Sequence, residues 1–184
     1  MTAQLTKRSS AQLAQRSFAV VSGPDKVNAM RERGFENVID AKASNVRETV
    51  ESLTVSQGVD VVFDPIGGDV TEQALQCLAD DGKLLTIGYA AGHIPKIPAH
   101  ILLLKNISIM GFNWGQYAGW GKTDERHKYG PQVRTAIEQL MVWWQSGDIN
   151  PTIYKTPPLG DFKQAMRLIK ARSTIGRIAL DTQQ

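Results

Sequence analysis

The clearest hydrophobic pattern in the chain is a pair of short apolar runs joined by a helical stretch. Val59–Phe63 is rich in β-branched residues and is followed by turn residues, and 83–87 is a second strand-like run that stops at Gly88. Between them, from Asp69 onward, apolar residues recur with helical spacing. The predicted helix ends at Asp81 and Gly82, and its apolar face carries Val70, Ala74, Leu75 and Leu78. Two strands joined by a helix form a βαβ unit, so we expect them to be parallel.

Strand-like and helical patterns alternate along the rest of the chain as well. Further strands are predicted at 18–21, 38–39, 107–112, 153–154 and 177–180, and further helices begin at Pro24, Asn45, Pro131 and Asp161. The apolar stripe expected on the longest helix consists of Val133, Ile137, Leu140, Met141 and Trp144. We expect a turn at 101–104 and a long loop at 113–130. The alternation predicts an α/β fold with a mostly parallel sheet.

Three stretches of the chain carry recognisable motifs: GVDVVFDPIGGDVTEQALQCLADDGKLLTIGYAAG, IPAHILLLKNISIMGFNWGQY and IKARSTIGRIAL. They resemble the nucleotide-binding domain of the quinone oxidoreductases, which belong to the zinc-independent part of the medium-chain dehydrogenase/reductase superfamily, and the resemblance covers 18–180. It implies a Rossmann-like, mostly parallel sheet with helices on both faces. It also implies three segments: a divergent 1–17, an incomplete nucleotide-binding domain at 18–150, and a strand-helix-strand at 151–184 that packs on the catalytic domain in the family.

The family's first nucleotide-binding strand and the glycine-rich turn after it have no counterpart in this sequence. The chain has 16 glycines, but none of them forms GxGxxG. Gly119 and Gly121 have the spacing of the first pair, but Asp124 stands where the third glycine belongs. Because the missing strand is central in the order 3-2-1-4-5-6, its loss leaves a gap between the strand at 18–21 and that at 59–63. The sheet must then close up, recruit residues 1–16, borrow a strand from a partner, or remain incomplete. The main cradle for a pyrophosphate is missing with the strand.

The resemblance implies an oxidoreductase that transfers a hydride from NADPH to a quinone or another activated small-molecule acceptor. The cofactor carries that chemistry, and the chain offers no residue for the role of catalytic acid, base, nucleophile or metal ligand. The alternative is a catalytically inactive remnant that dimerises or binds a partner. A Rossmann-type methyltransferase also contains a DVVFD strand, but it too needs a glycine-rich first turn.

Two residues after the first predicted strand match the family's adenosine-ribose position. Ser22 and Lys26 stand where NAD-preferring members carry an acid, so the resemblance points to NADP. The alternative is a helix N-terminus with a solvent-facing lysine. Arg172 matches a family arginine near the cofactor phosphate, and its alternative role is a last-turn cation that favours the helix dipole.

Residues at the ends of three predicted strands match the family's nicotinamide site. They are Gly67, Gly88, Tyr89, Phe112 and Trp114. Ordinary turn chemistry is the alternative for the two glycines, and packing in a core or interface is the alternative for the aromatic side chains. The family's edge strand, here 107–112, commonly pairs with its twin, so the resemblance predicts a homodimer.

Composition and charge change this picture little. The formal charge is +3, and the basic residues form no stripe with aromatics, so a nucleic-acid partner is not expected. No apolar run is long enough to span a membrane. The single cysteine, Cys77, is expected to be a buried hydrophobe, and a cytoplasmic location fits. The segment 1–17 resembles a mitochondrial transit peptide in composition but not in apolar periodicity.

Overall fold

The computed structural model describes residues 16–183. The chain divides into two compact units, one formed by 1–38 together with 136–184 and the other by 39–135. The helical turns expected at 11–16 fall almost entirely outside the described residues, as does most of the segment with transit-peptide composition. No helix in the described part is both long and apolar enough to cross a membrane.

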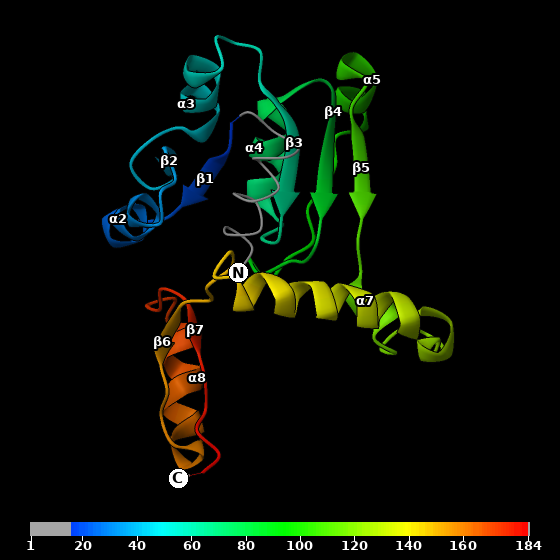
Figure 1. The fold of residues 1–184 in the computed structure, drawn as a ribbon. Coiled ribbons are helices and arrows are strands. Elements are labelled where there is room, and N and C mark those ends of the chain that lie inside the picture. Colours follow the sequence, from blue (N-terminus) through cyan, green and yellow to red (C-terminus); the bar gives the residue numbers. More distant parts are fainter. Residues whose placement is uncertain (1–15, 184) are drawn as a thin grey trace. The chain divides into compact units, whose positions relative to one another are not determined.

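The described residues alternate between strands and helices (Figure 1). The strands are β1 (Phe18–Val21), β2 (Asn37–Asp40), β3 (Val59–Asp64), β4 (Leu78–Thr86), β5 (Ser108–Gly111), β6 (Ile153–Lys155) and β7 (Arg177–Ile178). The helices are α2 (Pro24–Glu32), α3 (Val46–Leu53), α4 (Asp69–Cys77), α5 (Ala99–Lys105), α6 (Trp114–Tyr117), α7 (Arg126–Gln145) and α8 (Phe162–Lys170), with a 3₁₀ turn, η1, at Leu159–Asp161. The predicted α/β class is confirmed, and β3 pairs with β4, β4 with β5, and β6 with β7, all in parallel.

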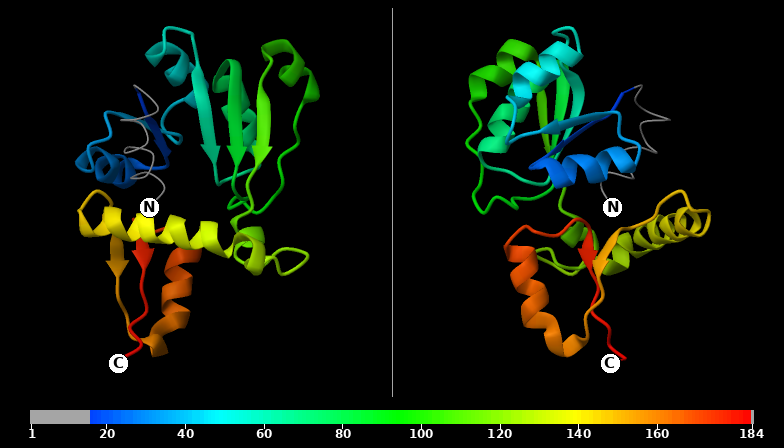
Figure 2. Two further views of the ribbon diagram at one scale, coloured as in Figure 1. Left: turned by 45° about the vertical axis from the view of Figure 1, so that its right-hand side comes forward. Right: turned by 90° about the vertical axis from the view of Figure 1, so that its left-hand side faces the viewer.

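The unit formed by 39–135 is built on the three-stranded sheet β3-β4-β5. The strand register aligns Val62, Leu84 and Ile109 in one row across the sheet. Helices α4 and α5 cover this face (Figure 2). The buried core beneath them consists of Leu75, Leu78, Leu84 and Ile107. The βαβ unit expected from the apolar pattern is therefore confirmed, together with the burial of Cys77 in α4.

The opposite face of the same sheet is apolar but largely exposed. The neighbouring register row aligns Phe63, Leu85 and Met110. The exposed fraction is 43% for Phe63 and 52% for Met110, and Val61 reaches 63%. Since side chains alternate between the two faces of a strand, Val61 and Phe63 share this face.

The described strands form separate sheets where a doubly wound fold has a continuous one. β1 and β2 form a sheet of two strands, and β3, β4 and β5 form another. No strand of the described residues joins them. The alternative in which residues 1–16 supply a strand falls almost entirely outside the described residues.

The junction of α4 and β4 differs from the prediction. The helix ends at Cys77 rather than at Asp81, because Leu78 already has extended backbone and pairs with Val59 as the first residue of β4. The Lys105 ammonium group donates to the carbonyl oxygens of Gln76, at 3.4 Å, and of Leu78. A side chain from α5 therefore satisfies carbonyl groups that the end of α4 leaves without a helical partner.

The face of α4 that is buried also differs from the expectation. Val70 is exposed, whereas Thr71 is fully buried, together with Leu75. The hydroxyl of Thr71 has a partner in the interior, the carboxylate of Asp64. A satisfied polar group is therefore buried in place of the apolar one that periodicity favoured.

The segment 99–130 contains more helix than expected. Residues 101–104 belong to α5 rather than to a turn, and α6 lies within the expected loop. Helix α7 begins at Arg126, ahead of Pro131. The carboxylate of Asp124 accepts a hydrogen bond from the Arg126 amide at 3.1 Å, and this contact satisfies one of the amides that a helix leaves unpaired at its N-terminal end.

The apolar stripe expected on α7 is not a core element of the described chain. Ile137, Met141 and Trp144 are each about half exposed, and no residue of α7 is buried. On α8, Ala165 is buried, but Phe162 is exposed. Periodicity identified the apolar faces correctly, but the described residues leave much of them uncovered.

The unit that contains the two chain ends is held by contacts between distant segments. The Arg33 guanidinium, at the C-terminal end of α2, donates to the Thr152 hydroxyl from Nε at 3.2 Å and from Nη2 at 2.7 Å. The Arg177 amide donates to the Thr152 carbonyl at 2.8 Å. Thr152 therefore connects α2 to the β6-β7 sheet.

Candidate functional site

The best-defined polar structure at the carboxyl end of the central sheet is the turn that follows β3. The Asp64 carboxylate, 3% exposed, accepts hydrogen bonds from the amides of Ile66 at 2.8 Å and Gly67 at 3.0 Å. Its second oxygen accepts from the Thr71 hydroxyl at 2.5 Å. A buried carboxylate is stable only when its oxygens are satisfied, so Asp64 acts as the internal support of this turn.

Gly67 is held in a conformation and a space that suit only glycine. Its φ of 76° lies in the left-handed region. A Cβ at this position would lie 2.6 Å from Tyr89 Cδ1 and 3.1 Å from Tyr89 Cα. The structure therefore brings Gly67 and Tyr89, two of the predicted site residues, into direct contact.

Gly88 is different from Gly67, although both end a strand. Its backbone does not need a left-handed φ, and a Cβ there would meet only the Pro65 carbonyl at 3.7 Å, an ordinary contact. Of the two glycines, only Gly67 therefore occupies a position that requires glycine.

Backbone hydrogen bonds join the turn after β3 to the turn after β4. The amides of Ile87, Ala90 and Ala91 donate to the carbonyls of Asp64, Pro65 and Ile66, respectively, at 2.9, 3.2 and 2.8 Å. His93 also lies against Gly68, with its Nε2 at 3.5 Å from the Asp69 carboxylate. The carboxyl ends of β3 and β4 therefore form one braced rim, which is where parallel sheets bind ligands.

Aromatic side chains gather after the neighbouring strand β5. The rings of Phe112 and Tyr117 stack with centroids 5.7 Å apart, and Trp114 lies 6.4 Å from Tyr117. Tyr129 meets Tyr117 edge-on at 4.8 Å. Phe112 and Trp114, predicted separately, are thus joined through Tyr117 and both remain partly exposed.

The three residues predicted for the phosphate side lie in the unit that contains the chain ends. Ser22 is exposed just after β1, and Lys26 is half-buried in the first turn of α2. Arg172 is exposed two residues beyond α8, with its φ at 54° and its amide bonded to the Ile169 carbonyl. Gly23, at the N-cap of α2, has a φ of 94° and open space around it.

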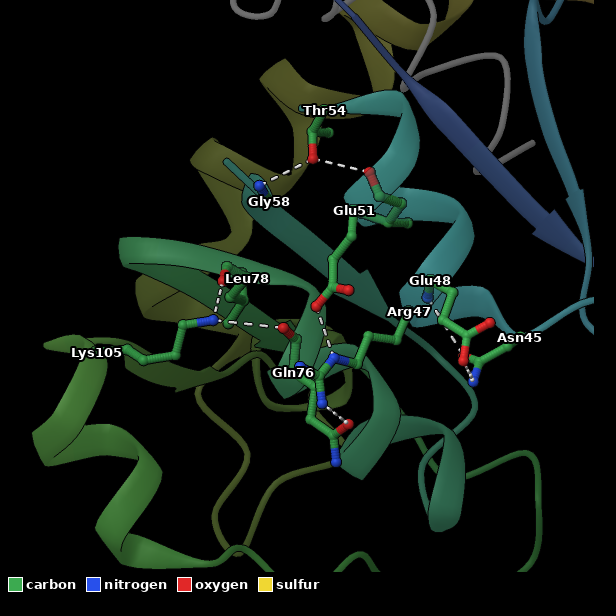
Figure 3. Close-up of polar contacts among 10 residues, drawn as sticks. Asn45, Arg47, Glu48, Glu51, Thr54, Gly58, Gln76, Leu78 and Lys105 are labelled. Carbon is green, nitrogen blue, oxygen red and sulfur yellow. Dashed lines mark hydrogen bonds and ion pairs between the residues drawn. The ribbon is translucent and has the colours of Figure 1, made fainter. Parts of the chain in front are cut away.

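A polar groove of about 560 Å³ lies beside α3 and α4. Arg47 on α3 pairs with Glu51 at 2.7 Å and reaches Gln76 on α4 at 3.4 Å, whereas Asn45 caps α3 by exchanging hydrogen bonds with Glu48 (Figure 3). The groove is lined by Ala41, Ser44, Asn45, Val46, Arg47, Glu48, Glu51, Gln73 and Gln76. In these contacts the polar side chains of the groove bond to one another, so we interpret the groove as a contact that holds α3 against α4.

The described residues offer no arrangement typical of acid-base, nucleophilic or metal catalysis. Asp64 is fully engaged in supporting its turn. Burial raises the pKa of the Cys77 thiol, which disfavours the reactive thiolate. No group of three or more metal-ligating side chains lies together within the described part of the chain.

Sequence reasoning missed several residues that organise this rim. Thr71 supports Asp64, His93 packs on Gly68, and Tyr117 joins Phe112 to Trp114. A threonine seven positions after an aspartate carries no local signal, because the pairing depends on how α4 packs against β3. The repeated aromatics after β5 were visible, but their contacts were not.

Comparison with known proteins identifies what the chain is similar to. A quinone oxidoreductase-like protein 2 homolog of Nematostella vectensis is 32% identical over 165 residues, covering 89% of this chain and 43% of that protein. Quinone oxidoreductase-like protein 2 of Bos taurus is 30% identical over 168 residues, with 91% and 46% covered. The chain thus spans about half the length of these relatives.

Solved structures of quinone oxidoreductases share the fold. The enzyme of Pseudomonas syringae pv. Tomato DC3000 superimposes with a TM-score of 0.79 at 23% identity, covering 97% of this chain and 51% of that one. The Escherichia coli enzyme complexed with NADPH also gives 0.79, at 24% identity, with 97% and 52% covered. The Rossmann-like fold expected from the resemblance is thereby confirmed. Since the family model described as zinc-binding dehydrogenase matches residues 1–127, the chain belongs to that family, among its quinone oxidoreductase-like members.

Proposed function

We propose that this chain is the nucleotide-binding part of an NADPH-dependent oxidoreductase of the quinone reductase type, which transfers a hydride to a quinone or another activated acceptor. The observation that carries the proposal is the rim at the carboxyl ends of β3 and β4, where Asp64 holds a buried glycine turn against Tyr89. The similarity to relatives named quinone oxidoreductase, and to the Escherichia coli quinone oxidoreductase complexed with NADPH, supports it.

The sequence offers candidate residues for the two ends of the cofactor but not for its middle. For the nicotinamide end the candidate is Gly67, which lies at the rim where a side chain would crowd Tyr89. For the adenosine-ribose end, Gly23 has open space beside its backbone, and Lys26 offers a cation for a 2′-phosphate. For the pyrophosphate, which joins the two halves of the cofactor, the sequence has no GxGxxG turn. The bound cofactor would supply the hydride, and the chain's own residues would orient it and exclude water.

The proposal is tested by titrating the full chain with NADPH and, separately, with NADH, while tryptophan fluorescence is recorded. We expect saturable quenching that is tighter with NADPH. A charge-assisted hydrogen bond contributes about 1.5–3 kcal/mol, so Lys26→Ala should weaken NADPH binding about tenfold or more and leave NADH binding unchanged. Lys163→Ala, at an exposed lysine of α8, is the matched control.

Binding and turnover are separated by a second measurement. NADPH oxidation is followed with 2-methyl-1,4-naphthoquinone as the acceptor. Binding without turnover would assign the chain a cofactor-holding role that needs further residues for reduction. Absence of any binding at millimolar NADPH would refute the cofactor proposal and leave the alternative, a module that dimerises or binds a partner. The missing glycine-rich turn favours that alternative.

We also propose that the chain forms a homodimer through β5. Among the described strands β5 is an edge of its sheet, hydrogen-bonded to β4 alone. The Phe112 amide points to the β4 side, where it donates to Thr86, so by alternation the Gly111 amide faces outward. Gly111→Pro removes that donor and should convert a dimer to a monomer in sedimentation velocity. A wild-type monomer at all concentrations would contradict the proposal.

A further inference from the structure

The other edge of the central sheet, along β3, also has unpaired backbone groups. Within the described residues, β3 is hydrogen-bonded to β4 alone. The Asp64 carbonyl points to the β4 side, because it accepts from the Ile87 amide at 2.9 Å. Backbone groups alternate in direction along a strand. The amides and carbonyls of Val61 and Phe63 therefore point away from β4, toward the open edge.

The side chains next to this edge are apolar. Val61 and Phe63 are among the exposed large hydrophobic residues of the chain. Strand β3 contains neither lysine nor proline, two devices by which edge strands resist pairing with other chains. Its one exposed charge is Asp60, near the start of the strand. Among the residues that the structure describes, the edge therefore combines backbone groups without a strand partner, an apolar surface and a single negative charge.

The sheet arrangement indicates what kind of partner fits. An all-parallel sheet is normally covered on both faces, and a doubly wound sheet has a strand beside the one equivalent to β3. A polypeptide that carries an apolar strand is thus a better match to this edge than a helix or a small ligand.

We propose that the open edge of β3 is a docking site for an apolar β-strand of another polypeptide, which pairs with the backbone of Val61 and Phe63 and becomes the fourth strand of the β3-β4-β5 sheet. Alternate side chains of the incoming strand lie beside Val61 and Phe63 on the exposed face. A basic residue at its start faces Asp60. This interaction is independent of cofactor binding and goes beyond the proposed activity.

The proposal is tested with the full chain, labelled with ¹⁵N, and a synthetic peptide. The peptide is capped at both ends and has a lysine followed by alternating valine and threonine, about six residues in all, a usual strand length. We expect saturable binding that slows amide exchange at Val61 and Phe63 about tenfold, the effect of one net hydrogen bond. Exchange at Asp60 and Val62, whose amides face β4, should stay unchanged.

Matched controls separate strand pairing from nonspecific apolar contact. A peptide of the same sequence with N-methyl groups on the amides that face β3 should lose the protection. Replacing the peptide's lysine with glutamate should weaken binding. Val61→Lys should weaken binding at least about tenfold, whereas Leu103→Lys, at an apolar residue of α5 that is 80% exposed, should leave it unchanged.

Several outcomes would overturn the proposal. One is no binding of the capped peptide, and another is binding without protection of Val61 and Phe63. Protection of these two amides from hydrogen exchange in the chain without peptide would also overturn the proposal, since the edge would already be occupied. Protection that rises with concentration would then identify a second copy as the occupant, and protection independent of concentration would identify another segment of the same chain.

Discussion

The Thr71 hydroxyl is the part of the rim whose removal has the most predictable energetic effect. Thr71 is 1% exposed, and its hydroxyl donates to the Asp64 carboxylate at 2.5 Å. Thr71→Val keeps the size and the β-branching of the side chain but deletes that donor. The amides of Ile66 and Gly67 both donate to the other carboxylate oxygen of Asp64, Oδ1. The substitution therefore removes the hydrogen-bond donor of the buried Oδ2.

The magnitude follows from the charge and burial of the acceptor. A hydrogen bond to a charged group contributes about 1.5–3 kcal/mol when it is buried, and the added methyl group recovers little because the pocket around it is polar on the Asp64 side. We therefore expect the free energy of unfolding of the 39–135 unit to fall by about 2 kcal/mol. With an m-value of about 2 kcal/mol/M in urea, the midpoint should fall by about 1 M.

The assay must report on this unit, because the chain divides into two. Urea unfolding is followed by the ¹H–¹⁵N signals of Leu84 and Leu85 in β4. Thr49→Val is the matched control: the Thr49 hydroxyl bonds to the Asn45 carbonyl at 2.8 Å in an exposed setting on α3, and its loss should cost less than about 0.5 kcal/mol. Equal losses in the two variants would refute the assignment of Asp64 and Thr71 as the buried support of the turn.

Three further predictions concern single contacts. Gly67→Ala should destabilise the unit by about 1–2 kcal/mol, the cost of a left-handed non-glycine residue, whereas Gly88→Ala should change the unfolding free energy by less than about 0.5 kcal/mol; equal effects in urea melts would contradict the distinction. Lys105→Met should cost about 1 kcal/mol by removing donors to the carbonyls at the end of α4, and faster amide exchange in β4 would report it, whereas unchanged exchange would show that the contact is not stabilising. The Arg126 guanidinium lowers the pKa of Asp124 from its ordinary value of 3.8 to about 2, so this pair stabilises the fold above pH 3.8 and loses that contribution as the pH falls through about 2. In a carboxyl ¹³C titration, Arg126→Gln should return the Asp124 pKa toward 3.8, and an unshifted midpoint would exclude the pairing.

Local patterns predicted the elements whose signals lie in neighbouring residues. The βαβ unit followed from two apolar runs and a helical repeat, and the start of α3 was predicted at Asn45, which caps the helix by exchanging hydrogen bonds with Glu48. The N-terminal boundary of α2 at Pro24, with Gly23 before it, also agrees with the structure. These features depend on interactions a few residues apart, which a single sequence displays directly.

Errors arose where a distant segment decided the outcome. Helix α4 stops at Cys77 because Leu78 pairs with Val59 in a strand. The apolar stripe on α7 contains the predicted residues, yet Ile137 and Trp144 are about half exposed, since periodicity reports an apolar face but not whether anything covers it.

The sequence by itself determined the α/β class, the parallel central unit, the family resemblance and the absence of a GxGxxG turn, because each of these is written in local patterns or motifs. Only the tertiary structure decided which of the candidate glycines is obligatory. Gly67 and Gly88 look alike in the sequence, but Gly67 alone combines a left-handed φ with contact against Tyr89. It also decided that no strand in the described part of the chain other than β4 pairs with β3, because strand order and hydrogen-bond direction depend on which segments pack together rather than on any one of them.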